Sequence, residues 1–386
     1  MKLLILILTL TLWASAATHA QTGGALQVSG YFQASPVRIS ADLPEPLGSE
    51  SWMEYRLQNR LNIRWDATES TTFHWQMRTR LYAGDLVRDF PAYADAIDSD
   101  DGLVNLSWMV ANQESWFLHY IPDRLYADWN RGDLNIRAGR QRVNWGINMV
   151  TNPNDIFNIY SPYDFDYPER PGSDAIRVRY FSGFASRFEV AVSPARELRN
   201  SVAAMLYAFH RGQTDFQLIG GYYRELLTTG GGWAADIRGM GFKGETMLYI
   251  DPSNGENGTL HNFITTSAID YMFDNSLFLV AEILYNHRGG REQFILLEEQ
   301  ISPDNPSFSR YQATMQLSYP IHPLLDGSMA AIWYPDEESL FMSPSLSYSV
   351  AEDFDLRVLG QFFIGSSDSV FSTAGNVLTA SLTWNF

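Results

Sequence analysis

The chain ends in the stretch NVLTASLTWNF (376–386), in which apolar and polar residues alternate without a break from Leu378 onward. Side chains of a β-strand point alternately to its two faces, so this pattern predicts a strand with one apolar and one wet face. The apolar face carries Leu378, Ala380, Leu382, Trp384 and Phe386. The chain thus closes on an amphipathic strand whose last residue is aromatic.

Strands of the same kind recur along the whole chain, most clearly at 53–66 and 72–82. A soluble β-sandwich would show the same alternation, but these strands run about eleven residues, which is the span that a tilted membrane strand needs. We expect eighteen strands, with boundaries uncertain by about two to four residues. They are 25–34, 53–66, 72–82, 114–129, 133–143, 173–181, 184–193, 202–211, 214–226, 232–239, 242–251, 262–273, 276–287, 309–319, 325–334, 340–350, 354–365 and 375–386.

The connections between these strands alternate in length. Short ones such as 130–132 and 212–213 alternate with long ones at 35–52, 83–113, 144–172, 252–261, 288–308 and 366–374. Short periplasmic turns, long outer loops and an even strand count are typical of outer-membrane barrels. The fold class predicted is therefore all-β, an antiparallel transmembrane β-barrel of about 18 strands (16–18).

The N-terminus has the pattern of an export signal. Lys2 precedes an apolar run from Leu3 to Ala14. We expect cleavage after Thr18-His19-Ala20, with Ala14-Ser15-Ala16 as the alternative site. We therefore expect residues 1–20 to be a signal peptide and residues 21–386 to form a single barrel. The chain has no cysteine, which excludes disulfides and a lipid-modified N-terminus. Its net charge of −17 argues against nucleic acid as a partner.

Basic residues are almost all arginine. Only Lys2 and Lys243 are lysines among the 27 basic residues, which suggests fixed, forked hydrogen bonding inside the structure. Arginines recur on the wet faces of the early strands, and after Gly139 two more change phase, for which we expect a bulge that turns them inward. The predicted basic wall of the pore comprises Arg56, Arg60, Arg64, Arg78, Arg80, Arg137, Arg140, Arg142, Arg177 and Arg179.

The long connection 144–172 is rich in aromatic residues, which argues against disorder. We expect it to be an ordered loop that folds toward the lumen and narrows it. Its acidic residues, Asp155, Asp164, Asp166 and Glu169, would face the basic wall and set up a transverse field. Two alternatives stay open: the loop packs on its own rim, or the opposite charges simply neutralise one another inside a filled lumen.

Catalytic and metal signatures are missing from the sequence. It contains no G-x-S-x-G, H-E-x-x-H or phosphate-loop motif, and its histidines lack metal spacing. Acidic clusters at 98–102 and 251–258 offer oxygen ligands for Ca²⁺, but neither completes a calcium-loop pattern. We therefore expect no enzyme, no cofactor and no metal site, although a barrel could assemble a hydrolase site from separate strands.

Two stretches carry a family resemblance. The terminal strand, with Trp384 and Phe386, resembles the assembly signal of outer-membrane proteins. The segment GRQRVNWG (139–146), followed by Pro153 and Asp155, resembles the G-R-Q-x-x-x-W-G…P-x-D segment of porin-like barrels. Those families are related to alginate-export and phosphate-selective porins, and many of their members have no known function. The resemblance implies a porin-like channel of 16 to 18 strands and carries no substrate with it.

The function expected is an outer-membrane channel for passive passage of small polar or anionic solutes in a Gram-negative bacterium. The alternative is a non-transporting barrel, its lumen filled, that binds or helps assemble surface polysaccharide. Expected partners are the lipids of the outer membrane, the barrel-assembly machinery and the solutes. The oligomeric state is left open, with a homo-oligomer as one option.

Overall fold

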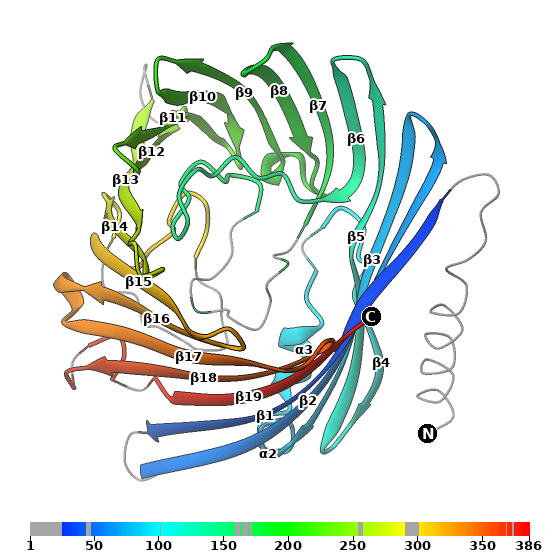
Figure 1. The fold of residues 1–386 in the computed structure, drawn as a ribbon, viewed down its shortest axis with the longest axis vertical. Helices are drawn as coiled ribbons and strands as arrows, with labels where there is room; N and C mark the ends of the chain where they lie inside the picture. Colours follow the sequence, from blue (N-terminus) through cyan, green and yellow to red (C-terminus); the bar gives the residue numbers. More distant parts are fainter. Residues whose placement is uncertain are drawn as a thin grey trace.

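The strands that the structure describes all join one antiparallel sheet that closes on itself (Figure 1). The computed structural model describes residues 25–43, 48–100, 102–158, 163, 169, 172–253, 258–289, 301–367, 369–372 and 374–386. Eighteen strands form the closed ring, and β4 is an additional strand that pairs only with β5 among the described residues. The predicted antiparallel barrel is therefore confirmed.

The bounds of the elements follow the chain. The strands are β1 Leu26–Leu43, β2 Gly48–Thr68, β3 Thr71–Gly84, β4 Trp108–Gln113, β5 Trp116–Arg131, β6 Leu134–Gln141, β7 Ser173–Gly183, β8 Ser186–Ser193, β9 Val202–Arg211, β10 Thr214–Tyr223, β11 Leu226–Ile237, β12 Met240–Asp251, β13 Thr259–Met272, β14 Phe278–Asn286, β15 Tyr311–His322, β16 Leu325–Tyr334, β17 Ser339–Ala351, β18 Phe354–Gly365 and β19 Asn376–Asn385. The helices are α2 Asp85–Asp89, α3 Ala92–Ile97, and the 3₁₀ turns η1 Leu198–Asn200 and η2 Pro335–Glu337.

Closure of the ring depends on β1, which pairs with β2 on one edge and with the last strand, β19, on the other. The final residue takes part: Phe386 and Gly30 exchange backbone hydrogen bonds of 3.0 and 2.9 Å. The rings of Trp384 and Phe386 lie 5.6 Å apart, and Trp384 also stacks on Phe32 at 5.9 Å. The terminal strand thus completes the barrel. Its predicted part in assembly stays a prediction.

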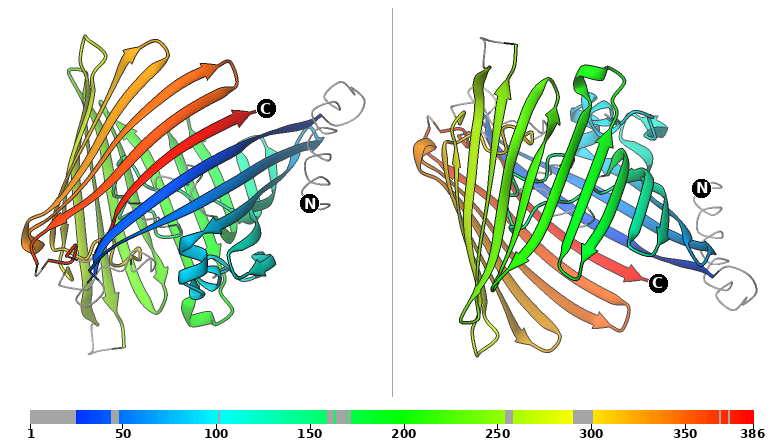
Figure 2. Two further views of the ribbon diagram at one scale, coloured as in Figure 1. Left: turned by 90° about the horizontal axis from the view of Figure 1, so that it is seen from below. Right: turned by 90° about the horizontal axis from the view of Figure 1, so that it is seen from above.

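Connections are sorted by length between the two ends of the barrel, as predicted; Figure 2 shows the tilted strands from the side. We call the end that carries the connection between β2 and β3 the turn end. The ring hairpins of the turn end are joined by two residues each, except that five residues join β13 and β14. The opposite end, here the loop end, carries the long connections, including 142–172 and 287–310. One connection at the loop end is short, the turn at Arg224 and Glu225, both with positive φ.

The predicted loop 35–52 is shorter in the structure than expected. Most of 35–52 is strand, because β1 runs to Leu43 and β2 begins at Gly48. Pro36 is unfavourable inside a strand, because proline lacks the amide hydrogen that a sheet needs. The strand tolerates it because the ladder to β19 is interrupted there, while Pro36 stays in register with Tyr55 on β2.

The predicted loop 83–113 holds two short helices, α2 and α3, and the extra strand β4. Likewise the glycine-rich segment 227–231, expected as a loop, lies inside β11. Local propensity disfavours glycine in strands, but pairing with β10 and β12 on both edges of β11 overrides it.

The two faces of the wall differ as the alternation predicts. Large apolar side chains on the outer face are exposed, for example Tyr55 at 55 %, Leu57 at 48 % and Trp65 at 47 %. The inner face is mostly buried, because inserted segments pack against it. Among the described helices, none is long and apolar enough to cross a membrane.

The sorting of the connections makes a topological prediction. We expect cysteines introduced at Ser99 and Ser367, exposed at the loop end, to react with a membrane-impermeant thiol reagent on intact cells. Cysteines at Ser70 and Asn275, at the turn end, should react only after the cells are opened. Labelling by mass shift on gels reads this out, and the natural chain without cysteine is its own blank. The reverse pattern would mean that the turn end faces outward.

Candidate functional site

The arginines predicted to form a basic wall lie mainly on β2, β3, β6 and β7. Arg60 is directly opposite Arg78, and Arg137 is directly opposite Arg177. Arg60 and Arg78 are 1 % and 7 % exposed, whereas Leu57, on the other face of β2, is 48 % exposed. These four guanidinium groups therefore face the lumen. Like charges directly opposite across a sheet destabilise it unless acids compensate them.

Arg60 has the densest set of partners. Its Nη1 lies 2.7 Å from Oδ2 of Asp123, and its Nε lies 3.5 Å from Glu169 of the 142–172 loop. It also donates to Asn62 and Gln76 at 3.0 Å each. Asp123 can reach inward because the ladder between β3 and β5 shifts register beside Gln76. The predicted contact between wall and loop exists here, but a wall acid is the nearer partner.

The second arginine pair is compensated by acids of the wall itself. Arg137 donates from Nε to Asp128 on β5 at 2.7 Å. Arg177 and Arg179 share Glu189 of β8, at 3.8 and 2.9 Å. The sequence analysis expected acids of the loop to be the counter-charges of these arginines. Acids of the neighbouring strands β5 and β8 supply the counter-charges instead.

Arg80 and Arg78 stand nearer the loop end of β3. Arg80 Nη2 donates to Nδ1 of the buried His119 at 3.2 Å, and Nε2 of His119 donates to Ser107 at 2.7 Å. Arg80 is also 5.4 Å from the ring centroid of Tyr82. His119 therefore has a structural partner on each ring nitrogen.

Arg56 lies near the middle of β2, and Arg64 lies near its turn end. Arg56 pairs with the buried Glu54 two residues before it. Arg64 pairs with Asp66 at 3.0 Å and is 49 % exposed at the turn end. Local i, i+2 pairs on one face of a strand thus screen both residues.

The position of Arg140 corrects a prediction. The expected bulge after Gly139 is not found, since neither neighbouring ladder shifts register there. Arg140 pairs in register with Leu125, which is 45 % exposed on the outer face. It is covered instead by the segment after α3, and binds Asp100 at 2.7 Å and Asp174 at 2.9 Å. Arg140 does not line the pore, because regular pairing keeps it in the outward phase.

The start of the 142–172 loop runs inside the ring of strands, where Figure 1 draws it in teal. Glu245 on β12 fixes it, accepting backbone N–H groups of Ile147, of Asn148 at 2.7 Å and of Asn154 at 2.9 Å. A carboxylate that accepts several charge-assisted hydrogen bonds is a strong anchor.

Further anchors hold the same segment to other strands. Glu282 on β14 accepts the backbone N–H of Thr151 at 2.9 Å. Trp145 donates from Nε1 to Glu189 at 2.8 Å, and its carbonyl accepts from Gln217 on β10 at 2.6 Å. The loop is therefore bound by polar groups from β8 to β14, around an apolar cluster that includes Val143, Trp145, Ile156, Leu206 and Met247.

A glycine of the wall makes room for this segment. Gly232 on β11 lies on the inner face beside Glu245. A Cβ there would come within 2.8 Å of Ile147 and 3.1 Å of Asn154. Gly232 thus allows close approach of the loop to the wall.

The acidic residues expected in this loop are distributed unevenly. Asp155 is buried and lies 3.8 Å from Arg142 at the beginning of the loop, so this pair is internal to the loop. Glu169 reaches Arg60, as described above. Asp164 and Asp166 lie outside the described residues.

Two more apolar clusters fill other sectors of the lumen near the loop end. The helices α2 and α3 pack on β1, β3 and β5 through residues that include Leu86, Val87, Tyr93, Val37 and Phe117. On the far side, Tyr163 and Phe371 from two connections pack on β16–β18. Burial raises the pKa of Tyr163 well above its ordinary value, so its hydroxyl stays protonated and hydrogen-bonds with Tyr334.

Sequence reasoning missed the single acids that organise the lumen. Asp123, Asp128, Glu189, Glu245 and Glu282 are all nine-tenths or more buried. A usable signal was present for Glu245 and Glu282, because each is the one acid in the inner part of its strand. Within the described part of the chain, no group of three potential metal ligands comes together.

Comparison with known proteins gives matches of structure and none of sequence. No family model and no curated protein matches the chain. The Acinetobacter baumannii protein OccAB4 superposes with a TM-score of 0.58 at 8% identity, over 95% of this chain and 98% of that one. Pseudomonas aeruginosa OccK5 (OpdH) gives 0.57 at 8% identity, over 93% and 98%.

A third match is the P. aeruginosa outer membrane protein OpdK, with a TM-score of 0.53 at 6% identity over 93% of this chain and 98% of that one. At such identities the likeness concerns the fold alone. The relation to alginate-export and phosphate-selective porins stays a prediction. The chain is thus similar over nearly its whole length, in its fold, to this group of solved barrels.

Proposed function

We propose that the chain is an outer-membrane channel for passive passage of small polar or anionic solutes through a constricted lumen. The observation that carries this proposal is the row of arginines on the inner face of a closed barrel, with Arg60 opposite Arg78 and Arg137 opposite Arg177. A barrel that only held its strands together would have no need of opposed like charges inside.

The electrostatics support anions as the favoured solutes. Guanidinium keeps its charge at any workable pH and presents a fork that fits a carboxylate or a phosphate. Wall acids compensate Arg60 and Arg137. Arg80, in contrast, contacts neutral groups, His119 and Tyr82. Net positive potential is therefore expected near the loop-end half of β3, where α2 and α3 narrow the lumen.

The same proposal covers location and assembly. Residues 1–20 act as the export signal, residues 21–386 form the barrel, and the turn end lies on the periplasmic side of a Gram-negative outer membrane. Trp384 and Phe386 present the assembly signal to the barrel-assembly machinery, and outer-membrane lipids surround the exposed apolar face. A homo-oligomer stays an open option, and an enzymatic activity is not part of the proposal.

Purified protein in planar bilayers tests the channel. We expect steady, ohmic single-channel currents in KCl, because a lumen lined by charged side chains stays hydrated even when loops narrow it. The control is the same protein unfolded by heat, checked by its shift in gel migration. Absence of current from folded, inserted protein would contradict the proposal.

A second candidate is a non-transporting barrel that binds or helps assemble surface polysaccharide. The observation that favours it is the packing of three apolar clusters into the lumen near the loop end. Under this alternative the compensated arginines are internal supports of a filled barrel. A closed channel with retained binding of polysaccharide to the folded protein would put this candidate ahead.

A further inference from the structure

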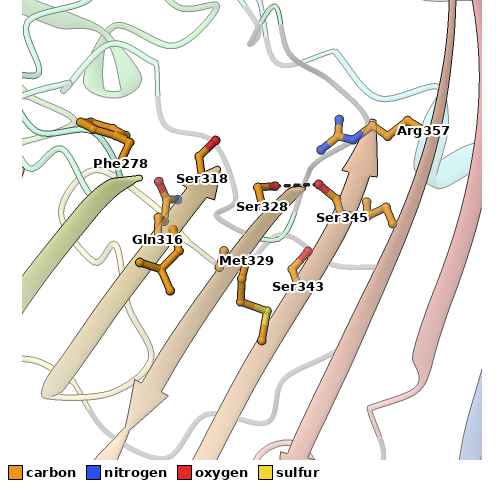
Figure 3. A pocket seen from close by; sticks show the side chains of 11 residues that line it. Phe278, Gln316, Ser318, Ser328, Met329, Ser343, Ser345 and Arg357 are labelled. Atoms are coloured by element: carbon orange, nitrogen blue, oxygen red, sulfur yellow. Dashed lines mark hydrogen bonds between the residues drawn. The ribbon is translucent and has the colours of Figure 1, made fainter. Parts of the chain in front are cut away.

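A cavity of about 220 Å³ lies on the inner side of the wall formed by β14 to β18, far from the arginine-rich strands (Figure 3). It is smaller than the roughly 300 Å³ at which pockets for drug-sized ligands begin, so it fits a small solute. The polar side chains of the lining that matter here are Gln316, Ser328, Ser343, Ser345 and Arg357.

Hydroxyl groups dominate the polar part of this lining. Ser328 and Ser345 hydrogen-bond to each other at 2.7 Å, and the dashed line in Figure 3 marks this bond. Ser343 is only 3 % exposed, yet its Oγ has no hydrogen-bond partner in the structure. A buried hydroxyl without a partner costs about 1–3 kcal/mol, so such a group commonly indicates a missing ligand or water.

Arg357 is the one charged residue of the lining. Its Nε is buried without a hydrogen-bond partner, and no ion pair of Arg357 is found among the described residues. Asp355 stands in the same inward phase nearer the turn end, and Asp326 stands in the same cross-strand row as Arg357, with Ser347 between them. Neither forms a salt bridge with Arg357 among the described residues. Arg60 and Arg137, in contrast, are compensated by acids.

An aromatic cluster closes the cavity on the side of the loop end. Towards the loop end, Phe341 follows Ser343 on the inner face of β17, and it packs with Phe363 and Tyr163 in the aromatic cluster of that sector. Gln361 on β18 holds the carbonyl of Tyr163 at 2.7 Å. A solute that enters from the turn end therefore meets Arg357 and the serines before it meets the aromatic cluster.

We propose that this cavity is a solute subsite for a small hydroxylated oxyanion, such as a polyol chain that carries one carboxylate or phosphate. Arg357 takes the anionic group, while Ser343 and Gln316 hydrogen-bond to hydroxyls. A bare anion would satisfy only the guanidinium, and a neutral polyol would leave it unpaired. The inference rests on the proposed channel and names the class of solute that dwells in it.

Interruption of single-channel KCl current by added solutes tests the subsite. The probes are gluconate and glycerol 3-phosphate, with hexanoate as a charged solute without hydroxyls and sorbitol as a hydroxylated solute without charge. We expect both hydroxylated anions to lengthen blocking events, and hexanoate and sorbitol to do so far less. A site that hydrogen-bonds a hydroxyl rejects analogues that lack it. Block by only one of the two probes identifies which oxyanion the subsite takes.

Single substitutions test which residues of the cavity hold the blocking solute. Arg357→Gln should weaken block by gluconate about tenfold, the value of a lost charge-assisted hydrogen bond. Ser343→Ala should weaken block by gluconate and leave block by hexanoate unchanged. The matched control is Thr228→Ala, at a buried threonine of β11 whose hydroxyl donates to the carbonyl of Leu248 and which lies outside the cavity. Gluconate should block this variant as it blocks the natural protein. Heat-shifted gel migration verifies that each variant is folded.

Failure of this inference and failure of the channel are distinguishable. Ohmic current with equal block by all four probes, or block unaffected by Arg357→Gln, overturns the subsite and leaves the channel intact. Absence of current overturns the channel. Calorimetry of gluconate with the folded protein in micelles then decides the subsite by itself: binding lost in Arg357→Gln supports it, and no binding to the natural protein overturns it.

Discussion

Replacing Glu245 and Glu282 together by alanine is expected to raise single-channel conductance several-fold and to make the current noisy. Glu245 accepts backbone N–H groups of three loop residues, and Glu282 accepts that of Thr151. Each hydrogen bond to a charged group is worth about 1.5–3 kcal/mol, and the N–H groups left behind would need water. The loop should therefore leave the wall and widen the lumen.

Two controls separate loosening of the loop from a change of charge. Glu245→Gln with Glu282→Gln removes the same two charges but keeps carbonyl acceptors, so conductance should rise much less. Asp215→Ala removes an exposed acid of the turn end that touches His210 and not the loop. Unchanged conductance in the folded double alanine variant would mean that this loop does not limit the current.

The second large effect concerns ion selectivity. Arg60→Ala with Arg78→Ala is expected to shift the reversal potential in a KCl gradient toward cations. The substitution removes two inward positive charges and leaves Asp123 and Glu169 without their guanidinium partner. Breaking a buried ion pair from one side costs about 3–5 kcal/mol, so lower thermal stability should accompany the shift.

Two further measurements make this test more specific: a repeat at high ionic strength, and a triple variant that also lacks the carboxylate of Asp123. Confined charges are screened less than exposed ones, so the shift should persist at high salt. Adding Asp123→Ala to the double variant removes the carboxylate that Arg60 neutralises in the natural protein. Part of the selectivity for anions should therefore return. If reversal potentials of the folded double variant match the natural protein at low and high salt, Arg60 and Arg78 do not face a conducting path. The filled-barrel alternative would then move ahead.

Much of the wall could be predicted because its pattern is local. The alternation around Arg60 on β2 and Arg78 on β3 identifies the inner face without knowledge of any partner strand. Boundaries failed where pairing overrode local preference, as at Pro36 in β1 and at the glycines of β11. β4 was missed because six residues in a long connection carry too weak a period.

The candidate site was predicted less well, because its contacts join residues far apart in the chain. Glu245 meets Asn148 across 97 residues, and nothing local to either residue indicates the other. Arg140 shows the same limit: its spacing places it in the outward phase, and the bulge expected after Gly139 to turn it inward is not formed, because Arg140 pairs regularly with Leu125 and Asp174.

The sequence by itself determined that this protein is an antiparallel barrel with sorted connections and an arginine-rich inner face. Period-two alternation, strand length and a terminal aromatic residue are properties of consecutive residues, so no tertiary contact is needed to read them. Only the tertiary structure decided which acids compensate the arginines, how Glu245 and Glu282 hold the loop, and that Arg357 and Ser343 line one cavity, with no ion pair of Arg357 among the described residues. These features depend on how the closed ring brings distant strands around one lumen, where burial sets the cost of every unpaired polar group.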